Sequence, residues 1–124
     1  MTALAMTDTD NFVRSVCLSL PETSEVETWG HPSFRAGSRT FAALETVSGR
    51  PSVAVRVEPF EVEAFESDER FFVTPYGRGK WVSIWLDIGV EKELVREFIM
   101  RAFRLVANKR MLVALAAQSQ RTGG

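Results

Sequence analysis

The chain has 124 residues and a mass of 13.9 kDa, which fits a single domain. With 45% hydrophobic and 25% charged residues, its composition is that of a globular protein and excludes a disordered chain. It contains no run of about 18 apolar residues, so we expect no membrane span, and its first residues lack the features of a secretory signal. One cysteine and one histidine exclude an internal disulfide and a Cys/His zinc site, so we expect a cytoplasmic protein without metal or cofactor.

The net charge of -1 is unevenly distributed along the chain. Residues 1–69 carry 12 acids and 5 bases, whereas residues 70–124 carry 4 acids and 10 bases. A nearly neutral total argues against strong non-specific binding of nucleic acid, although the basic second half leaves room for one positive face. The alternative is that the two halves attract one another, within the fold or across a dimer.

The domain is expected to span residues 9–118, with flexible ends at 1–8 and 119–124. Apolar residues at helical spacing predict a helix over about residues 9–19, which Pro21 ends. Cys17 belongs to the apolar stripe of this helix, and we interpret it as a buried, unreactive core residue.

The central part of the sequence alternates between polar and apolar residues, which predicts strands separated by Gly- and Pro-containing turns. A short helix beginning at Pro59 interrupts the strands, and a wide apolar stripe predicts a long final helix. The segment after Asn108 continues that helix or forms a second one. We expect strands at about 25–29, 33–35, 40–44, 52–57, 71–74 and 81–86, and helices at about 59–67 and 91–107.

These elements predict an α+β fold in which an antiparallel sheet packs against helices on one face. The expected order is α-β-β-β-α-β-β-α, with three or four strands in the first run. Tight turns between successive strands exclude a βαβ arrangement.

The search for catalytic motifs is negative. The sequence has no phosphate-binding P-loop, no dinucleotide-binding fingerprint and no serine in a nucleophile elbow. His31 is the one imidazole base available, and nothing in the sequence brings Cys17 or a serine to it. The acidic residues at 58, 61, 63 and 66 are interpreted as the solvated face of the short helix. We therefore expect a protein that is not an enzyme.

Two segments combine aromatic residues, bases and glycine-containing turns. The first runs from Trp29 to Phe41 and the second from Thr74 to Val82. Aromatic rings can stack on nucleobases, and bases at turns can reach phosphates. The alternative is that the rings belong to the core and the bases only keep turns and sheet edges soluble.

The same segments resemble the MmcQ/YjbR-like family. The resemblance rests on Trp29-Gly30-His31-Pro32-Ser33-Phe34-Arg35, on Pro75-Tyr76-Gly77-Arg78-Gly79-Lys80-Trp81-Val82 and on Pro59 with its acidic short helix, and it extends over about residues 10–110. It implies a CyaY-like fold and DNA binding through two hairpin-like wings, and it implies no catalytic residues. The second motif has only two bases, and residues 58–69 are strongly acidic.

Our first hypothesis is a non-catalytic protein that binds double-stranded DNA weakly through the two turns. Arg35, Arg39, Arg78 and Lys80 would contact phosphates, and Tyr76 or Trp81 would stack on an exposed base.

Our second hypothesis is a pocket for a small molecule, lined by Trp29, His31, Tyr76 and Trp81. Aromatic walls around one titratable group are a common arrangement for ligand sites, and His31 would orient an anion or transfer a proton. The alternative is that His31 is a turn residue whose ring bonds the backbone.

The apolar residues near the C-terminus extend beyond the stripe that one sheet face can cover. Either the segment after Asn108 folds back over the core, or its apolar residues form a dimer patch. We expect the fold-back and a monomer, with a homodimer as the alternative.

Overall fold

The structure, a computed structural model, describes residues 2–75 and 79–123, with side chains described for residues 8–75 and 79–120. Its centre is a six-stranded antiparallel sheet in the order β1-β2-β3-β4-β6-β5. The elements in chain order are α1 (Thr2–Leu18), β1 (Thr23–Thr28), β2 (His31–Ala36), β3 (Arg39–Val47), β4 (Arg50–Arg56), the 3-10 helix η1 (Pro59–Phe65), β5 (Phe71–Val73), β6 (Trp81–Trp85), α2 (Lys92–Val106) and α3 (Lys109–Gly123).

The predicted α+β class and antiparallel sheet are confirmed, with differences in detail. Four strands precede the short helix, and a separate helix α3 follows α2. Helix α1 begins at Thr2 rather than near residue 9, because no glycine or proline interrupts the residues before Asp10. Helix α3 continues to Gly123, beyond the expected end of the domain at residue 118.

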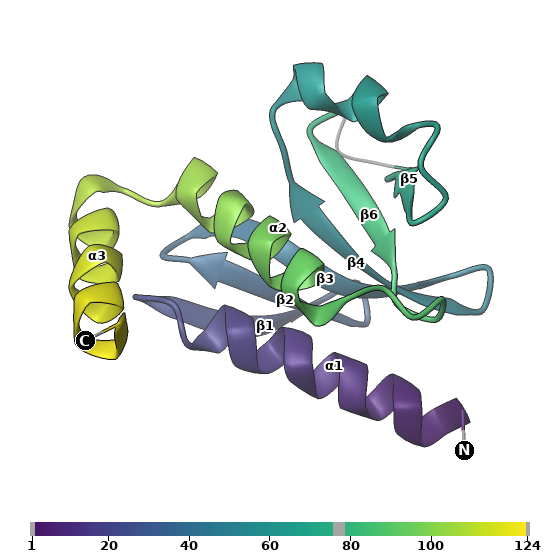
Figure 1. The fold of residues 1–124 in the computed structure, drawn as a ribbon, viewed down its shortest axis with the longest axis horizontal. Coiled ribbons are helices and arrows are strands. Elements are labelled where there is room, and N and C mark those ends of the chain that lie inside the picture. The colour runs from purple at the N-terminus through teal and green to yellow at the C-terminus, as the bar shows by residue number, and fades with distance from the viewer. Residues whose placement is uncertain (1, 76–78, 124) are drawn as a thin grey trace.

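Helices α1 and α2 lie side by side against one face of the sheet (Figure 1). Helix α2 packs on β3 and β4, and α1 packs on β1, β3 and α2. Phe41 of β3 and Phe103 of α2 are fully buried and meet edge to face, with ring centroids 5.7 Å apart. The main hydrophobic core therefore lies between this face and the two helices.

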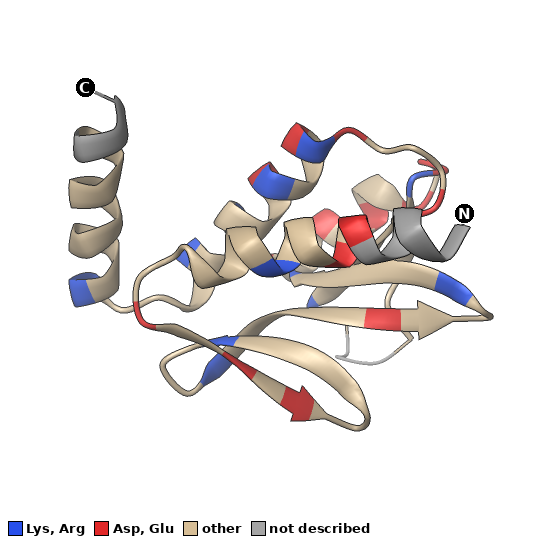
Figure 2. Cartoon of the chain, turned by 90° about the horizontal axis from the view of Figure 1, so that it is seen from below, with Lys and Arg blue, Asp and Glu red and all other residues tan. Residues whose placement is uncertain are grey.

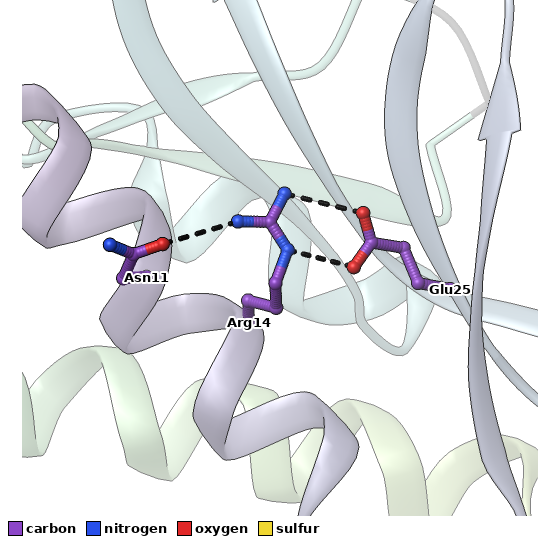
Figure 3. Close-up of polar contacts among 3 residues, drawn as sticks. All are labelled: Asn11, Arg14 and Glu25. Atoms are coloured by element: carbon purple, nitrogen blue, oxygen red, sulfur yellow. Dashed lines mark hydrogen bonds and ion pairs between the residues drawn. The ribbon is translucent and has the colours of Figure 1, made fainter.

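The edge strand β1 is joined to α1 by a bidentate ion pair (Figure 3). Arg14 Nε donates to Glu25 Oε1 at 2.7 Å, and Arg14 Nη2 donates to Glu25 Oε2 at 3.2 Å. Thr23 adds a second link, since its hydroxyl lies 2.8 Å from the carbonyl oxygens of Cys17 and Leu20. These contacts orient Glu25 toward the helices, and they place the neighbouring β1 residues Ser24 and Val26 on the opposite face.

The segment after Asn108 forms helix α3, which stands at one end of the molecule and contributes Met111 and Leu115 to the core (Figure 1). Ala107 has an extended conformation that ends α2, and the Asn108 side chain accepts a hydrogen bond from the Met111 amide at 2.9 Å. Met111 and Leu115 are buried in the core, whereas Leu112 and Val113 are exposed. Within the described residues, no helix is long and apolar enough to cross a membrane.

Candidate functional site

The face of the sheet turned away from α1 and α2 is called here the open face. Side chains alternate between the two faces of a strand. The residues that alternate with the buried core residues therefore lie on the open face. The open face of β1 to β4 carries Ser24, Val26 and Thr28 of β1, His31, Ser33 and Arg35 of β2, Thr40, Ala43 and Glu45 of β3, and Ser52, Ala54 and Arg56 of β4.

A row of small residues forms the middle of the open face. Ser33, Ala43, Ala54 and Ser83 are register partners across β2, β3, β4 and β6. All four are buried although no helix covers them, because larger side chains stand on both sides of the row. Two members of the row, Ser33 and Ala43, form the floor of a depression in the sheet.

A β-bulge in β3 shapes one side of this depression. Phe34 pairs with Ala42 but Arg35 pairs with Thr40, so Phe41 is the extra residue. Phe41 and Ala42 are both fully buried in the core. The shift turns Thr40 to the open face, directly opposite Arg35, where regular alternation would have turned it toward the helices.

The depression contains a cavity of about 450 Å³, called here the sheet groove. Residues of β1, β2 and β3 line the groove together with Trp81 of β6. The side chains between β3 and β6 are small, so the indole of Trp81 borders the same cavity. Three of the four residues predicted for a ligand pocket line it, and the fourth, Tyr76, lies outside the described residues. The complete lining is Thr28, Trp29, His31, Ser33, Thr40, Ala43 and Trp81.

Trp29 is held at the rim of the sheet groove by a two-residue turn. Trp29 and Gly30 connect β1 to β2, with φ of 55° and 83°. Positive φ at both positions is the geometry of a type I′ turn, which favours Asn-Gly and is strained for a bulky side chain. The Trp29 side chain is 94% exposed, so burial in the core does not offset this strain. The alternative considered from the sequence, that this ring belongs to the core, is therefore wrong for Trp29.

His31 is the first residue of β2 and contacts a carboxylate that the sequence analysis did not single out. Its Nε2 lies 3.2 Å from Oε2 of Glu45, whose side chain is only 7% exposed. Glu45 Oε2 accepts no well-aligned hydrogen bond in the described residues, so its contact with His31 is one of proximity. Burial raises the pKa of Glu45, and the nearby His31 opposes that rise. The available signal was an acidic residue that directly follows the apolar run Phe41–Leu44.

Of the bases predicted to contact DNA, the three that the structure describes do not gather on one surface. Arg35 points to the open face, whereas Arg39 lies across from Ala36 on the helix side and donates to the Val106 carbonyl at 3.5 Å. Lys80 is exposed and borders a small hollow that includes Leu105 of α2. Arg78, like Tyr76, lies outside the described residues. Elsewhere basic and acidic residues are interspersed (Figure 2).

Trp81 and Trp85 lie on the same face of β6 but differ in their surroundings. Trp85 stacks on Phe72 with ring centroids 4.1 Å apart, and the Arg50 guanidinium lies 3.7 Å from its ring centroid. Arg50 in turn forms a bidentate pair with Asp87. Within the described part of the chain, Trp81 has no such ring or cation contact, so its indole is available to a ligand in the sheet groove.

Other candidate sites are weaker. A larger hollow of about 720 Å³ follows α2, but charged side chains of both signs line it, including the Arg96–Glu93 pair. Cys17 is buried in the core on the helix side of the sheet, so it does not meet His31. In the acidic short helix η1, Glu58 and Glu61 form a capping box at the N-terminus, and Glu61 also forms an ion pair with Arg101. The described residues hold no group of three metal-ligating side chains.

The fold and the sheet groove define an α+β domain whose antiparallel sheet is covered by helices on one face and hollowed on the other. The chain belongs to the YjbR family, whose sequence model matches residues 18–105. The family expected from the two aromatic and basic segments is therefore confirmed. The comparison with curated proteins found no match.

Two solved structures show a similar fold. Protein DR2400 of Deinococcus radiodurans, described as carrying a DUF419 domain, is 22% identical with a TM-score of 0.68, over 84% of this chain and 85% of that one. A protein from Pseudomonas syringae is 13% identical with a TM-score of 0.66, over 77% of this chain and 96% of that one. At these identities the likeness concerns the fold alone.

Proposed function

We propose that this domain binds a small planar ligand in the sheet groove and performs no covalent chemistry on it. The observation that carries the proposal is the convergence of Trp29, His31 and Trp81 around a floor of small residues. These side chains come from a turn and two strands, and they share one cavity of about 450 Å³, within the size range of ligand sites. Trp81 supplies a flat apolar wall, Trp29 an exposed second ring, and His31 a polar group between them.

The strain at Trp29 supports the same proposal. A tryptophan at φ 55° that is almost wholly exposed is unfavourable for the isolated fold in two ways, through its backbone and through its apolar surface. A ligand that packs against the ring reduces the second cost, the exposed apolar surface. Strained backbone and exposed aromatic surface together are typical of a residue kept for binding.

The proposal is tested with two neutral probes, indole and 2-naphthamide, observed by saturation-transfer NMR and by thermal shift. We expect saturable binding that Trp81→Leu weakens about tenfold, because the substitution removes an aromatic wall. Trp85→Leu is the matched control, since Trp85 lies on the same strand and face but is occupied by Phe72 and Arg50. Absence of binding, or equal losses in the two variants, would overturn the proposal.

A second candidate function is the weak binding of double-stranded DNA predicted from the sequence. It is supported by the presence of Arg35 and Trp81 on one exposed face of the sheet. About four phosphate contacts predict that log affinity falls with log salt at a slope near -3 to -4. Titration of a labelled duplex at several salt concentrations tests this, comparing wild type with an Arg35/Arg39/Arg78/Lys80 alanine variant. Unchanged binding in the variant argues against the DNA hypothesis.

We expect the protein to act as a monomer in the cytoplasm without a bound cofactor. The fold-back of Met111 and Leu115 covers apolar surface that was the main argument for a dimer. The single buried Cys17 is compatible with a reducing compartment.

A further inference from the structure

Among the described residues, Arg35 lacks the hydrogen-bond or ion-pair partner that most of the other arginines have. Arg14, Arg50, Arg70, Arg96, Arg101 and Arg110 each form an ion pair. Arg39 donates to a backbone carbonyl of α2. Arg35 makes no hydrogen bond or ion pair within the described residues, and its Nε is buried. A buried donor without an acceptor is unfavourable until an acceptor reaches it.

The position of Arg35 places this unsatisfied donor beside the sheet groove. Arg35 lies two residues after Ser33 on the same face of β2, and directly across from Thr40. Ser33 and Thr40 both line the groove. Neighbours at these positions are within reach of a long side chain.

The open face offers Arg35 no carboxylate of its own. Among the open-face positions of β1 to β4, the acidic residue is Glu45, and it is engaged with His31. Glu25, the nearest acid on β1, points to the other face and pairs with Arg14. The positive charge of Arg35 is therefore uncompensated next to an aromatic cavity.

We infer that the ligand of the sheet groove is a planar aromatic compound bearing one carboxylate, and that Arg35 binds this carboxylate. The inference rests on the proposed function, since it specifies the ligand of the same groove. The aromatic ring packs on Trp81 below the rim formed by Trp29, and the carboxylate accepts hydrogen bonds from the Arg35 guanidinium. The planar fork of arginine matches a carboxylate with two parallel hydrogen bonds, which a neutral amide on the same ring cannot accept in the same way.

The test compares 2-naphthoate with 2-naphthamide, which differ in charge but hardly in shape, at pH 7.5 by isothermal titration calorimetry and saturation-transfer NMR. We expect the wild-type protein to bind 2-naphthoate about tenfold more tightly than 2-naphthamide. Arg35→Gln should reduce this ratio to about one and leave the affinity for 2-naphthamide unchanged. Arg39→Gln is the matched control, because it removes the same charge from the same hairpin on the opposite face.

The possible outcomes separate this inference from the proposed function. If the wild type binds the two probes equally, the inference about the carboxylate is overturned. The proposed function then stands, with a neutral ligand in the groove. A loss of the ratio in Arg39→Gln as large as in Arg35→Gln also overturns it, since the preference would then follow net charge rather than the groove. Absence of binding by both probes overturns the inference and the proposed function together.

Discussion

His31 and Glu45 face one another across β2 and β3 on the open face of the sheet, with Nε2 and Oε2 3.2 Å apart. Glu45 is the more buried partner, and His31 is the one that lines the sheet groove. This arrangement places the buried carboxyl group beside the His31 ring at the border of the groove. It also places an ionisable carboxyl group where ionisation is unfavourable, and the consequence is measurable.

Glu45 should make the stability of the protein decrease as pH rises. Burial raises its pKa above the ordinary value of 4.5, so its ionisation costs folding free energy. The stability associated with a protonated Glu45 is complete below pH 4.5 and is lost as pH rises through the pKa of the folded state. Glu45→Gln does not ionise, so the stability of this variant relative to wild type should increase between pH 4 and pH 8. Urea denaturation at both pH values measures this change.

Glu63→Gln, at an exposed position on η1, is the control for removal of one negative charge. If wild type and Glu45→Gln respond to pH in parallel, the carboxyl group is not the origin of the dependence.

Trp29→Asn should stabilise the fold while weakening ligand binding. Asparagine adopts positive φ far more readily than tryptophan, so we expect the free energy of unfolding to rise by about 1 kcal/mol. The ring at the groove rim is lost, so the affinity for 2-naphthamide should fall. Thermal denaturation and probe titration measure the two effects on the same samples.

Ser48→Asn provides the control for the turn itself. Ser48 and Gly49 connect β3 to β4 with φ of 53° and 76°, the same turn geometry away from the groove lining. This variant should gain stability without any change in probe binding. A Trp29→Asn protein that is less stable than wild type would show that the ring contributes to the fold.

Leu115→Ala should destabilise the domain far more than Val113→Ala. Leu115 is 5% exposed and packs in the core, whereas Val113 is 62% exposed on the same helix. Removing a buried leucine side chain costs about 2–4 kcal/mol, and an exposed valine less than about 0.5 kcal/mol. Denaturant unfolding compares them, and sedimentation of the full chain should report a monomer. Similar costs for the two variants, or a dimer that Val113→Ala dissociates, would assign α3 to an interface.

Cys17 should react with a thiol reagent only after unfolding. Its side chain is fully buried, and burial raises the pKa of the thiol, so both access and thiolate are lacking. Ellman's reagent should therefore modify the native protein no faster than the protein opens, and react at once in 6 M guanidinium chloride. Rapid reaction of the folded protein would place Cys17 near the surface.

Local sequence patterns account for most of the fold. The stripe of Val13, Val16 and Cys17, the alternation around Val53 and Val55, and Pro59 at the start of η1 each correspond to an element in the structure. Such patterns can be recognised in the sequence because one face of each element must be buried. His31 and Pro32 were expected to interrupt the strands but belong to β2, since Trp29 and Gly30 alone complete the turn.

The pairing of the strands determines which side chains meet in the sheet groove. The sequence predicted Trp29, His31 and Trp81 as pocket residues, but Glu45 and the floor residues Ser33 and Ala43 were not identified. Arg35 and Arg39 were grouped because they flank one turn, and the paired strands turn them to opposite faces. Register across four strands and a single bulge at Phe41 set which side chains share a face. Those are relations between paired strands, and local composition carries no information about them.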